Sequence, residues 1–280
     1  MEKYIKCPLN YVGGKTKLLP QILPLFPTNI DTFIDLFCGG ANVAVNVKAN
    51  KIVAIDINLP IIELYRTFQN LSIETILSYI QDRINEYKLD KTNKEGYLTF
   101  RKNYNANKNP LDLFILICYS FNNQIRFNSK GDFNMPFGKD RSSFNNRIKE
   151  NLINFHSAIK DIKFASERFR DFNIDELKEN DFVYVDPPYL ITCASYNERN
   201  GWNEKDENDL CELLDRLNAK GIKFALSNVL THKGQKNEIL NNWLNNNHYN
   251  VHHLNVNYSN CNYQVKDKVS KSDEVLITNY

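Results

Sequence analysis

Residues 181–189 read Asp181-Phe182-Val183-Tyr184-Val185-Asp186-Pro187-Pro188-Tyr189. The β-branched and aromatic residues at 182–185 predict a short buried strand. Asp186 follows at its carboxyl end, where open α/β sheets bind ligands. Because Asp186 and Pro187 each precede a proline, both are held extended. The stretch therefore predicts a fixed carboxylate, a directed Pro187 carbonyl and a nearby aromatic ring at Tyr189. An ordinary strand end with a proline-rich turn is the alternative.

The composition indicates one large domain, or a domain with an insert. The chain has 280 residues, of which 42% are hydrophobic, and only 10 Gly and 9 Pro. These values leave room for a sizeable core and argue against long disordered tracts. The net charge of +2 means that any basic surface must be local.

The cysteines and apolar stretches bear on the cellular compartment. The six cysteines are scattered, without zinc-like spacing, and indicate buried thiols in a reducing compartment. The five histidines show no spacing that favours a metal. The chain begins with no signal region and has no apolar run long enough to span a membrane. We expect a soluble, cytoplasmic protein with no metal site and no membrane contact.

Two further strands are predicted before residues 181–189. Residues 32–40, Thr-Phe-Ile-Asp-Leu-Phe-Cys-Gly-Gly, predict a strand and a glycine turn, followed by a helix over residues 41–49. The next strand, residues 51–55, ends at Asp56, which is placed to bind ribose hydroxyls. The turn has fewer glycines than a dinucleotide fingerprint, so a nucleoside ligand such as S-adenosylmethionine is favoured. A plain βαβ unit is the alternative.

A second glycine motif lies near the start of the chain. Tyr11-Val12-Gly13-Gly14-Lys15 combines a glycine pair, which lets a ligand approach the backbone, with a cationic side chain. A helix over residues 16–25, interrupted by two prolines, is predicted to follow. On its own this motif is more often an ordinary turn than a ligand site.

Taken in order, these motifs resemble the Dam-type (alpha group) family of DNA adenine-N6 methyltransferases. The order is the lysine motif, the glycine motif, Asp56, a long insert and Asp-Pro-Pro-Tyr. The family usually has tryptophan where this chain has Tyr11, so an aromatic ring is kept. The resemblance implies an α/β fold, with a Rossmann-like S-adenosylmethionine-dependent methyltransferase sheet and an inserted, mainly helical target-recognition domain that carries a β-hairpin. We expect residues 1–58 and 161–280 to form the catalytic domain and residues 59–160 the insert.

The resemblance also implies the site residues. It gives Asp186, Pro187 and Tyr189 catalytic roles. The cofactor, S-adenosyl-L-methionine, would contact Tyr11, Lys15, Asp35, Phe37, Gly39, Asp56, Asp171, Phe172 and Asp186. In the Asp171-Phe172 pair, the carboxylate can accept the adenine amine while the ring packs against the purine.

The middle of the chain changes pattern. Helical periodicity appears over residues 60–68 and 72–87, and residues 111–119 form a helix or a buried strand. Asn128-Ser129-Lys130-Gly131 predicts a hairpin tip, and basic side chains, amides and aromatics surround it. Such a mixture suits phosphate contact and base reading, although a solvated hairpin is equally compatible. The resemblance makes Asn123, Arg126 and Lys139 candidate DNA contacts.

The remaining segments complete the sheet. Strands are predicted at 160–166 and 221–226, helices at 204–219 and 236–246, and a closing antiparallel pair at 251–258 and 274–278. The stretches 190–202 and 227–234 look closer to methyltransferases that accompany type IIS restriction enzymes than to relatives that methylate GATC.

The function implied is methyl transfer from S-adenosylmethionine to the N6 amine of an adenine flipped out of double-stranded DNA. Asp186 and the Pro187 carbonyl would accept the two amine hydrogens, and the Tyr189 ring would stack on the base. We expect a monomer, with any cognate restriction endonuclease acting separately. The alternatives are a methyltransferase for another amine, in cytosine N4, RNA or a protein glutamine, and a catalytically silent DNA-binding module.

Overall fold

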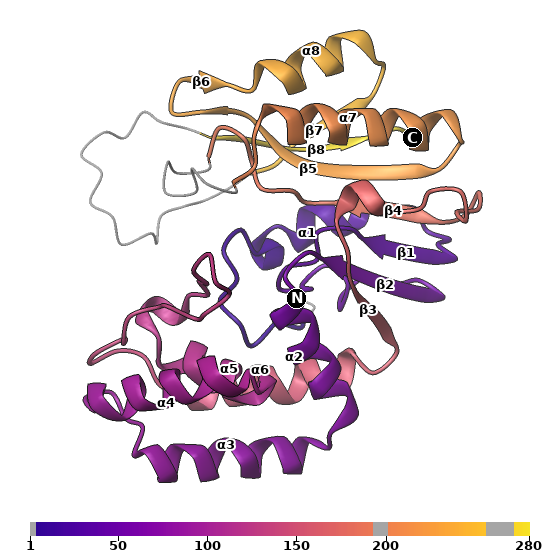
Figure 1. Ribbon diagram of the computed structural model, residues 1–280. Helices are drawn as coiled ribbons and strands as arrows, with labels where there is room; N and C mark the ends of the chain where they lie inside the picture. Colours follow the sequence, from indigo (N-terminus) through magenta and orange to yellow (C-terminus); the bar gives the residue numbers. More distant parts are fainter. Residues whose placement is uncertain (1–3, 193–200, 256–271) are drawn as a thin grey trace. The chain divides into compact units, whose positions relative to one another are not determined.

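The computed structural model describes residues 4–192, 201–255 and 272–280 (Figure 1). The chain forms two compact units. The helical unit comprises Met1–Thr16, Gly39–Asn46 and Asn58–Ser166, and the sheet unit comprises Lys17–Cys38, Val47–Ile57 and Glu167–Tyr280. The division into catalytic and target-recognition domains made from the sequence is one of function, and it stays a prediction.

The sheet unit is built on a mixed sheet. Its strands are β1 (Thr32–Asp35), β2 (Lys51–Asp56), β4 (Phe182–Val185), β5 (Lys223–His232), β6 (Gln235–Lys236), β7 (Asn250–His253) and β8 (Asp273–Thr278). They follow the order β2-β1-β4-β5-β8-β7, and β6 pairs with β5. The pairs β2–β1, β1–β4 and β4–β5 are parallel, whereas β8 runs antiparallel to both β5 and β7. The α/β class and the predicted strands are confirmed.

The β4 strand is buried along its whole length, as its sequence predicts. The ring of Phe182 packs edge-on against Phe26 at 4.9 Å, and Phe33 of β1 lies 5.8 Å away. The carboxylate of Asp181 accepts hydrogen bonds from the backbone N–H groups of Thr32 and Lys178 at 3.0 and 2.9 Å. Asp181 therefore ties the start of β4 to the start of β1.

Short and long helices accompany the sheet. They are α1 (Leu19–Ile22), η2 (Leu23–Leu25), η4 (Phe169–Asp171), α7 (Glu204–Ala219) and α8 (Glu238–Asn246). A further short helix, η1 (Lys15–Lys17), spans the point in the sequence where the helical unit ends and the sheet unit begins. The side chains of Asn203 and Asn237 cap α7 and α8, as expected for asparagine at this position. The α7 helix contacts β5 and α8. The predicted closing pair is confirmed for β7 and β8, and residues 256–258 of the prediction lie outside the described residues.

The prediction of a helix over residues 41–49 is wrong, because these residues form successive turns. Ala41 has a φ of 51°, in the left-handed region. The side-chain oxygens of Asn42 and Asn46 accept hydrogen bonds from the backbone N–H groups of Cys7 and Ile5 at 3.0 and 2.9 Å. Asparagine side chains thus bind a distant backbone segment, and this competes with helix formation.

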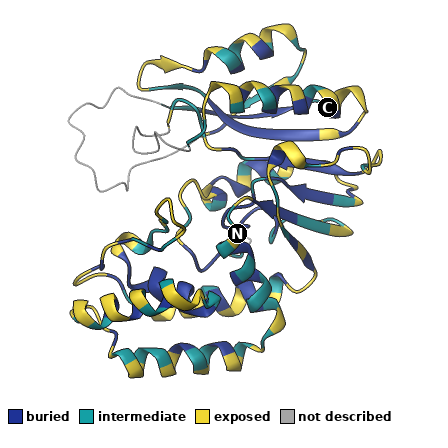
Figure 2. Ribbon diagram, in the orientation of Figure 1, coloured by how far each residue is buried: buried dark blue, intermediate teal, exposed yellow. Residues whose placement is uncertain are grey.

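The helical unit is organised around one buried helix. Its elements are α2 (Leu59–Asn70), α3 (Ile73–Tyr87), α4 (Lys94–Asn107), α5 (Pro110–Tyr119), η3 (Phe121–Asn123), α6 (Asn146–Ala158) and β3 (Ile162–Ser166). The α5 helix is buried over nearly its whole length (Figure 2). It is apolar on nearly all sides and contacts α2, α3 and α4. Asn109 caps it and Pro110 occupies its first position, which explains why this apolar run is a helix and not a strand.

The predicted hairpin is confirmed in a minimal form. Two isolated bridges join its arms, Ser120 with Phe137 and Phe127 with Phe133. The side chain of Asn105 on α4 both donates to the Phe133 carbonyl at 3.1 Å and accepts from the Phe133 N–H at 2.9 Å. The Asn105 side chain thus makes the same pair of hydrogen bonds that a neighbouring strand would make, and it holds the returning arm of the hairpin on α4.

Among the described residues, no helix is long and apolar enough to cross a membrane.

Gly96 in the first turn of α4 gives a test of this packing. A methyl group at Gly96 would collide with the Tyr87 carbonyl oxygen and the Asn93 side chain. Alanine exceeds glycine by about 1 kcal/mol in helix propensity, but overpacking costs about 1–3 kcal/mol. Gly96→Ala should therefore lower the free energy of unfolding by up to about 2 kcal/mol in urea denaturation.

The neighbouring exposed position supplies the control. Glu95→Ala should change the free energy of unfolding by no more than about 0.5 kcal/mol. A Gly96→Ala protein more stable than the wild type would show that the end of α3 and the start of α4 are not packed as described.

Candidate active site

Three aspartates stand at the carboxyl edge of the parallel strands in the sheet unit. Asp35 and Asp56 are the last residues of β1 and β2, and Asp186 directly follows β4. The strand register pairs Asp35 with Ala54 on one side and with Tyr184 on the other. Asp35 and Asp56 are buried and Asp186 is half-buried. The sheet thus brings together the three carboxylates that the sequence singles out.

Asp186 is held within its own tetrapeptide. The phenol of Tyr189 donates a hydrogen bond to Asp186 Oδ1 at 3.1 Å. Burial raises the pKa of Tyr189 well above its usual value, and the Asp186 carboxylate adds to the shift. Because the phenol stays protonated at neutral pH, it remains a donor to Asp186. Pro187 between them is buried, and both Pro187 and Pro188 restrict the backbone.

A second phenol joins β4 to its neighbour β5. The hydroxyl of Tyr184 in β4 lies 2.8 Å from Ser227 Oγ in β5, and both residues are buried. Burial raises the pKa of Tyr184 well above its usual value, with a further contribution from the negative charge of Asp186. This hydrogen bond holds β5 beside the end of β4, where Asp186 follows.

Three aromatic rings from separate segments of the sheet unit meet beside the loop that follows β1. The half-buried ring of Phe37 lies 5.5 Å from Phe169 and 5.6 Å from Trp202, measured between centroids, and Phe169 lies 5.4 Å from Trp202. We call these three rings the aromatic wall. Asp171 and Phe172 follow Phe169 closely; Asp171 is exposed and Phe172 half-buried.

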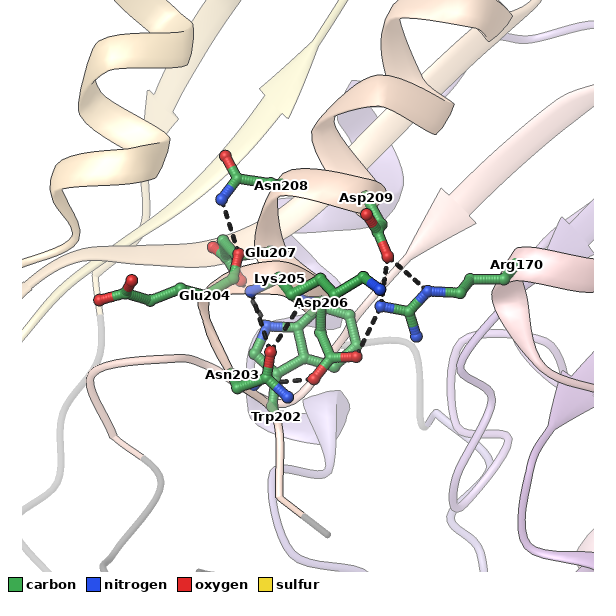
Figure 3. A network of polar contacts seen from close by, with 9 residues as sticks. All are labelled: Arg170, Trp202, Asn203, Glu204, Lys205, Asp206, Glu207, Asn208 and Asp209. Carbon is green, nitrogen blue, oxygen red and sulfur yellow. Dashed lines mark hydrogen bonds and ion pairs between the residues drawn. The ribbon is translucent and has the colours of Figure 1, made fainter.

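Charged groups fix the segment that carries Phe169 (Figure 3). The Arg170 guanidinium binds Asp206 at 2.8 Å and Asp209 at 2.5 Å, both on α7, and lies over the Phe169 ring at 4.7 Å. Hydrogen bonds to both carboxylates raise the pKa of Arg170, against the opposing effect of desolvation, which is the largest single influence. Arg170 thereby anchors η4 to the first turns of α7.

The remaining predicted cofactor residues, Tyr11, Lys15 and Gly39, belong to the helical unit. Gly39 has a φ of 46°, and a methyl group built there would lie 2.9 Å from the Tyr11 ring. The Gly39 carbonyl accepts a hydrogen bond from the Tyr65 hydroxyl at 2.8 Å. Lys15 is buried, and its Nζ donates to the Gly13 carbonyl at 2.9 Å. The two glycine motifs of the sequence therefore pack together through Tyr11.

The predicted DNA contacts are also in the helical unit, near the hairpin. Arg126 is exposed and donates from Nε to Asn134 Oδ1 at 2.8 Å and from Nη2 to the Asn134 carbonyl at 2.9 Å. Lys139 is exposed. Asn123 has a φ of 53° and donates to the Cys118 carbonyl at the end of α5 at 2.8 Å. In this conformation Asn123 acts as a helix cap.

The sheet unit has donor and acceptor groups that fit a nucleoside. A carboxylate such as Asp56 at the tip of the second strand can accept hydrogen bonds from two ribose hydroxyls. The half-buried face of Phe37 offers an aromatic surface for a purine. Among the described residues, no group of three His, Cys, Asp or Glu side chains could hold a metal ion.

Sequence reasoning missed several residues of this region. Trp202 and Ser227 fall in the stretches 190–202 and 227–234 and Glu207 in the predicted helix 204–219, and the sequence assigns none of the three a role. The position of Ser227 at the same sheet edge as Asp186 is a consequence of strand order, which no local pattern encodes. An isolated tryptophan just before a well-capped helix is the signal that could have drawn attention to Trp202.

Comparison with known proteins gives a consistent picture. A family model described as D12 class N6 adenine-specific DNA methyltransferase matches residues 11–260. Type II methyltransferase M.FokI from Planomicrobium okeanokoites is 52% identical over 283 residues, covering 99% of this chain and 43% of that protein. Modification methylase StsI from Streptococcus sanguinis is 48% identical over 285 residues, covering 100% of this chain and 43% of that protein. DNA adenine methylase from Escherichia coli (strain K12) is 27% identical over 229 residues, 79% of each chain. The chain thus spans less than half the length of the first two relatives.

The contact between Tyr11 and Gly39 can be tested by substitution. Gly39→Ala adds a methyl group against the ring and places alanine at a positive φ. The left-handed conformation alone costs about 1–2 kcal/mol, and the collision adds about 1–3 kcal/mol. Chemical denaturation should therefore show a loss of at least about 2 kcal/mol in the free energy of unfolding.

A double-mutant cycle separates the two causes. In a Tyr11→Ala background, Gly39→Ala should cost only the conformational part, about 1–2 kcal/mol. An equal cost in both backgrounds would contradict the close packing of the ring on Gly39.

Proposed function

Because this chain belongs to the D12 class N6 adenine-specific DNA methyltransferase family, we propose that it transfers a methyl group from S-adenosylmethionine to the N6 amine of adenine in double-stranded DNA. Family membership confirms the resemblance found in the sequence. The observation that carries the proposal is the geometry at Asp186. A carboxylate at the end of a buried parallel strand is followed by two prolines and is hydrogen-bonded by Tyr189 at 3.1 Å.

This geometry supports activation of an exocyclic amine. The lone pair of the adenine amine is delocalised into the ring, which makes the nitrogen a poor nucleophile. If Asp186 and the Pro187 carbonyl accept its two hydrogens, the lone pair is available to attack the methyl carbon in line. The new N–C bond would form as the C–S bond breaks and its electron pair returns to sulfur, and the nitrogen would then release one proton to solvent by way of Asp186. The negative charge of Asp186 stabilises the positive charge that develops on the nitrogen.

The sheet edge supports the placement of the methyl donor. S-adenosylmethionine supplies an electrophilic methyl group when it is bound. We propose that Asp56 accepts hydrogen bonds from the ribose, and that Phe37, Asp171 and Phe172 contact the adenine. Asp35 lies at the end of β1, the strand that pairs directly with β4, and so stands beside the strand that leads to Asp186. For Tyr11, Lys15 and Gly39, contact with the cofactor stays a prediction from the family resemblance.

The DNA side of the proposal rests on the helical unit. The exposed Arg126 and Lys139 near the hairpin are charged groups of the kind that bind phosphates and base edges. Because the target amine is inaccessible inside a duplex, the base must leave the stack, at a cost of a few kcal/mol. Stacking on Tyr189 would return about 1–3 kcal/mol of this cost.

The relatives suggest the biological setting. Two proteins with about half of their aligned residues identical to this chain are named as a type II methyltransferase and a modification methylase. We propose that this protein likewise modifies DNA in a restriction-modification system, in the branch that accompanies type IIS enzymes. It would act as a monomer in the cytoplasm, on sites that a separate endonuclease cuts.

Substitution of Asp186 tests the proposed chemistry directly. Asp186→Ala removes the main acceptor and the negative charge, so methyl transfer to duplex DNA should fall by at least about 100-fold. Transfer of a radiolabelled methyl group measures the rate, and calorimetry measures S-adenosylmethionine binding separately.

The matched control is Asp175→Ala in the same unit, where the side chain is 87% exposed. Its methyl transfer should stay within twofold of the wild type, roughly as for other surface changes. Near-normal transfer by the Asp186→Ala protein would refute the assignment of Asp186.

The proposed DNA contact at Lys139 predicts a change in salt dependence. Each lysine that binds a phosphate contributes about 0.9 to the slope of log affinity against log salt. Lys139→Ala should therefore lower that slope by about 1 in fluorescence-anisotropy titrations with duplex DNA. Lys163→Ala, at an exposed position on β3, should leave the slope unchanged. Equal slopes for wild type and Lys139→Ala would remove Lys139 from the interface.

A further inference from the structure

Glu207 is a buried carboxylate that the proposed chemistry does not use. It lies in the first turn of α7 and is only 1% exposed. Its Oε1 accepts hydrogen bonds from Asn228 Nδ2 at 3.0 Å and from Asn237 Nδ2 at 2.7 Å. Its Oε2 accepts a hydrogen bond from the indole Nε1 of Trp202 at 2.5 Å. A buried carboxylate needs such donors, because an unsatisfied charge is costly.

The three donors come from three different segments of the sheet unit. Trp202 precedes α7, Asn228 lies in β5 next to Ser227, and Asn237 caps α8. Glu207 therefore ties Trp202, which stands just before α7, to β5 and to the start of α8. Figure 3 shows Trp202 and Glu207 at the start of α7.

The indole that Glu207 holds is part of the aromatic wall. Its ring meets Phe37 nearly edge-on, at 78° and 5.6 Å, and lies 5.4 Å from Phe169. Because aromatic rings attract one another in this edge-to-face geometry, the Trp202 ring helps to hold the Phe37 ring in place. Rotation of Trp202 away from Glu207 would remove one side of the support for Phe37.

We propose that Glu207 is a positioning residue for S-adenosylmethionine, acting through Trp202 on the aromatic face that receives the cofactor adenine. The inference rests on the proposed function, since it takes Phe37 to be a wall of the cofactor site. The Glu207 carboxylate accepts the hydrogen bond from the Trp202 indole N–H. The indole in turn supports the Phe37 ring, and Phe37 presents its face to the purine. Loss of any link leaves Asp186 in place and weakens cofactor binding.

The same helix supplies a matched control. The indole Nε1 of Trp243 donates to Asp215 Oδ1 at 2.9 Å, and the Tyr249 hydroxyl donates to the same oxygen at 2.9 Å. Trp243 packs on Phe224 and Tyr249, away from the aromatic wall. Asp215→Asn thus perturbs an equivalent tryptophan–carboxylate bond that the proposal does not connect to the cofactor.

The test measures cofactor binding with and without this bond. Glu207→Gln places an amide N–H₂ among three donors, so at least one of the hydrogen bonds is lost. Calorimetry should show the Kd for S-adenosylmethionine rising by about tenfold or more. The KM for S-adenosylmethionine should rise similarly, with kcat at saturation within about twofold of the wild type. Asp215→Asn should keep the wild-type Kd.

Fluorescence supplies a readout independent of turnover. Since the chain has two tryptophans, Trp243→Phe leaves Trp202 as the only indole. In that background, S-adenosylmethionine should change the Trp202 emission, and Glu207→Gln should abolish the change at the same cofactor concentration. Trp202→Phe keeps a ring but removes the N–H, so its Kd should rise by less than that of Trp202→Ala. If Glu207→Gln fails to fold, the comparison of the Kd values of Trp202→Phe and Trp202→Ala tests the proposal in its place.

The outcomes separate the two levels of the proposal. A wild-type protein that binds S-adenosylmethionine, together with Glu207→Gln or Trp202→Ala variants that bind it equally well, would overturn the role of Glu207 and leave the proposed function standing. A folded wild-type protein that binds no S-adenosylmethionine would overturn both.

Discussion

The pairing of β4 between β1 and β5 is the constraint on which the rest of the site depends. Because β4 runs parallel to both neighbours, Asp35 at the end of β1, Asp186 just after β4 and the Ser227–Asn228 pair within β5 lie side by side although they are far apart in sequence. Asp181 fixes the start of β4 and the Tyr184–Ser227 bond fixes its end. With both ends held, the two prolines leave Asp186 little conformational freedom. A carboxylate prepared in this way loses little entropy when it binds an amine.

Around this strand the fold relies on polar side chains used as structural donors and acceptors. Asparagines cap α4, α5, α6, α7 and α8. In the helical unit Asn105 pairs with the returning arm of the hairpin, and in the sheet unit Asn228 and Asn237 satisfy the buried Glu207. Each bond is worth only about 1 kcal/mol net, yet the loss of one partner would leave a buried polar group unsatisfied. These hydrogen bonds fix the segments that connect strands and helices, and the Trp202 ring of the aromatic wall is held by one of them.

Local sequence patterns were sufficient for the main strands and for α2, α3, α7 and α8, whereas α4 and α6 were not predicted. The run at 182–185 predicted β4, and α7 begins and ends where its periodicity does, because hydrophobic period and capping are local properties. The helix expected at 41–49 failed because Asn42 and Asn46 bind residues near the start of the chain. The roles of Glu207 and Trp202 were missed for a related reason: their partners lie on other strands and helices. Asp186 could be singled out early because two prolines mark it locally, whereas the carboxylate of Glu207 has no such mark.

The central claim is that Asp186, at the end of β4, serves a methyltransferase that acts on adenine N6. Its most direct test is to incubate the protein with duplex DNA and S-adenosylmethionine carrying a labelled methyl group, and then to digest the DNA to nucleosides and identify the labelled product by mass spectrometry. The account predicts that the label is found in N6-methyladenine. Label in N4-methylcytosine, or DNA that carries no label although the cofactor is bound, would contradict it.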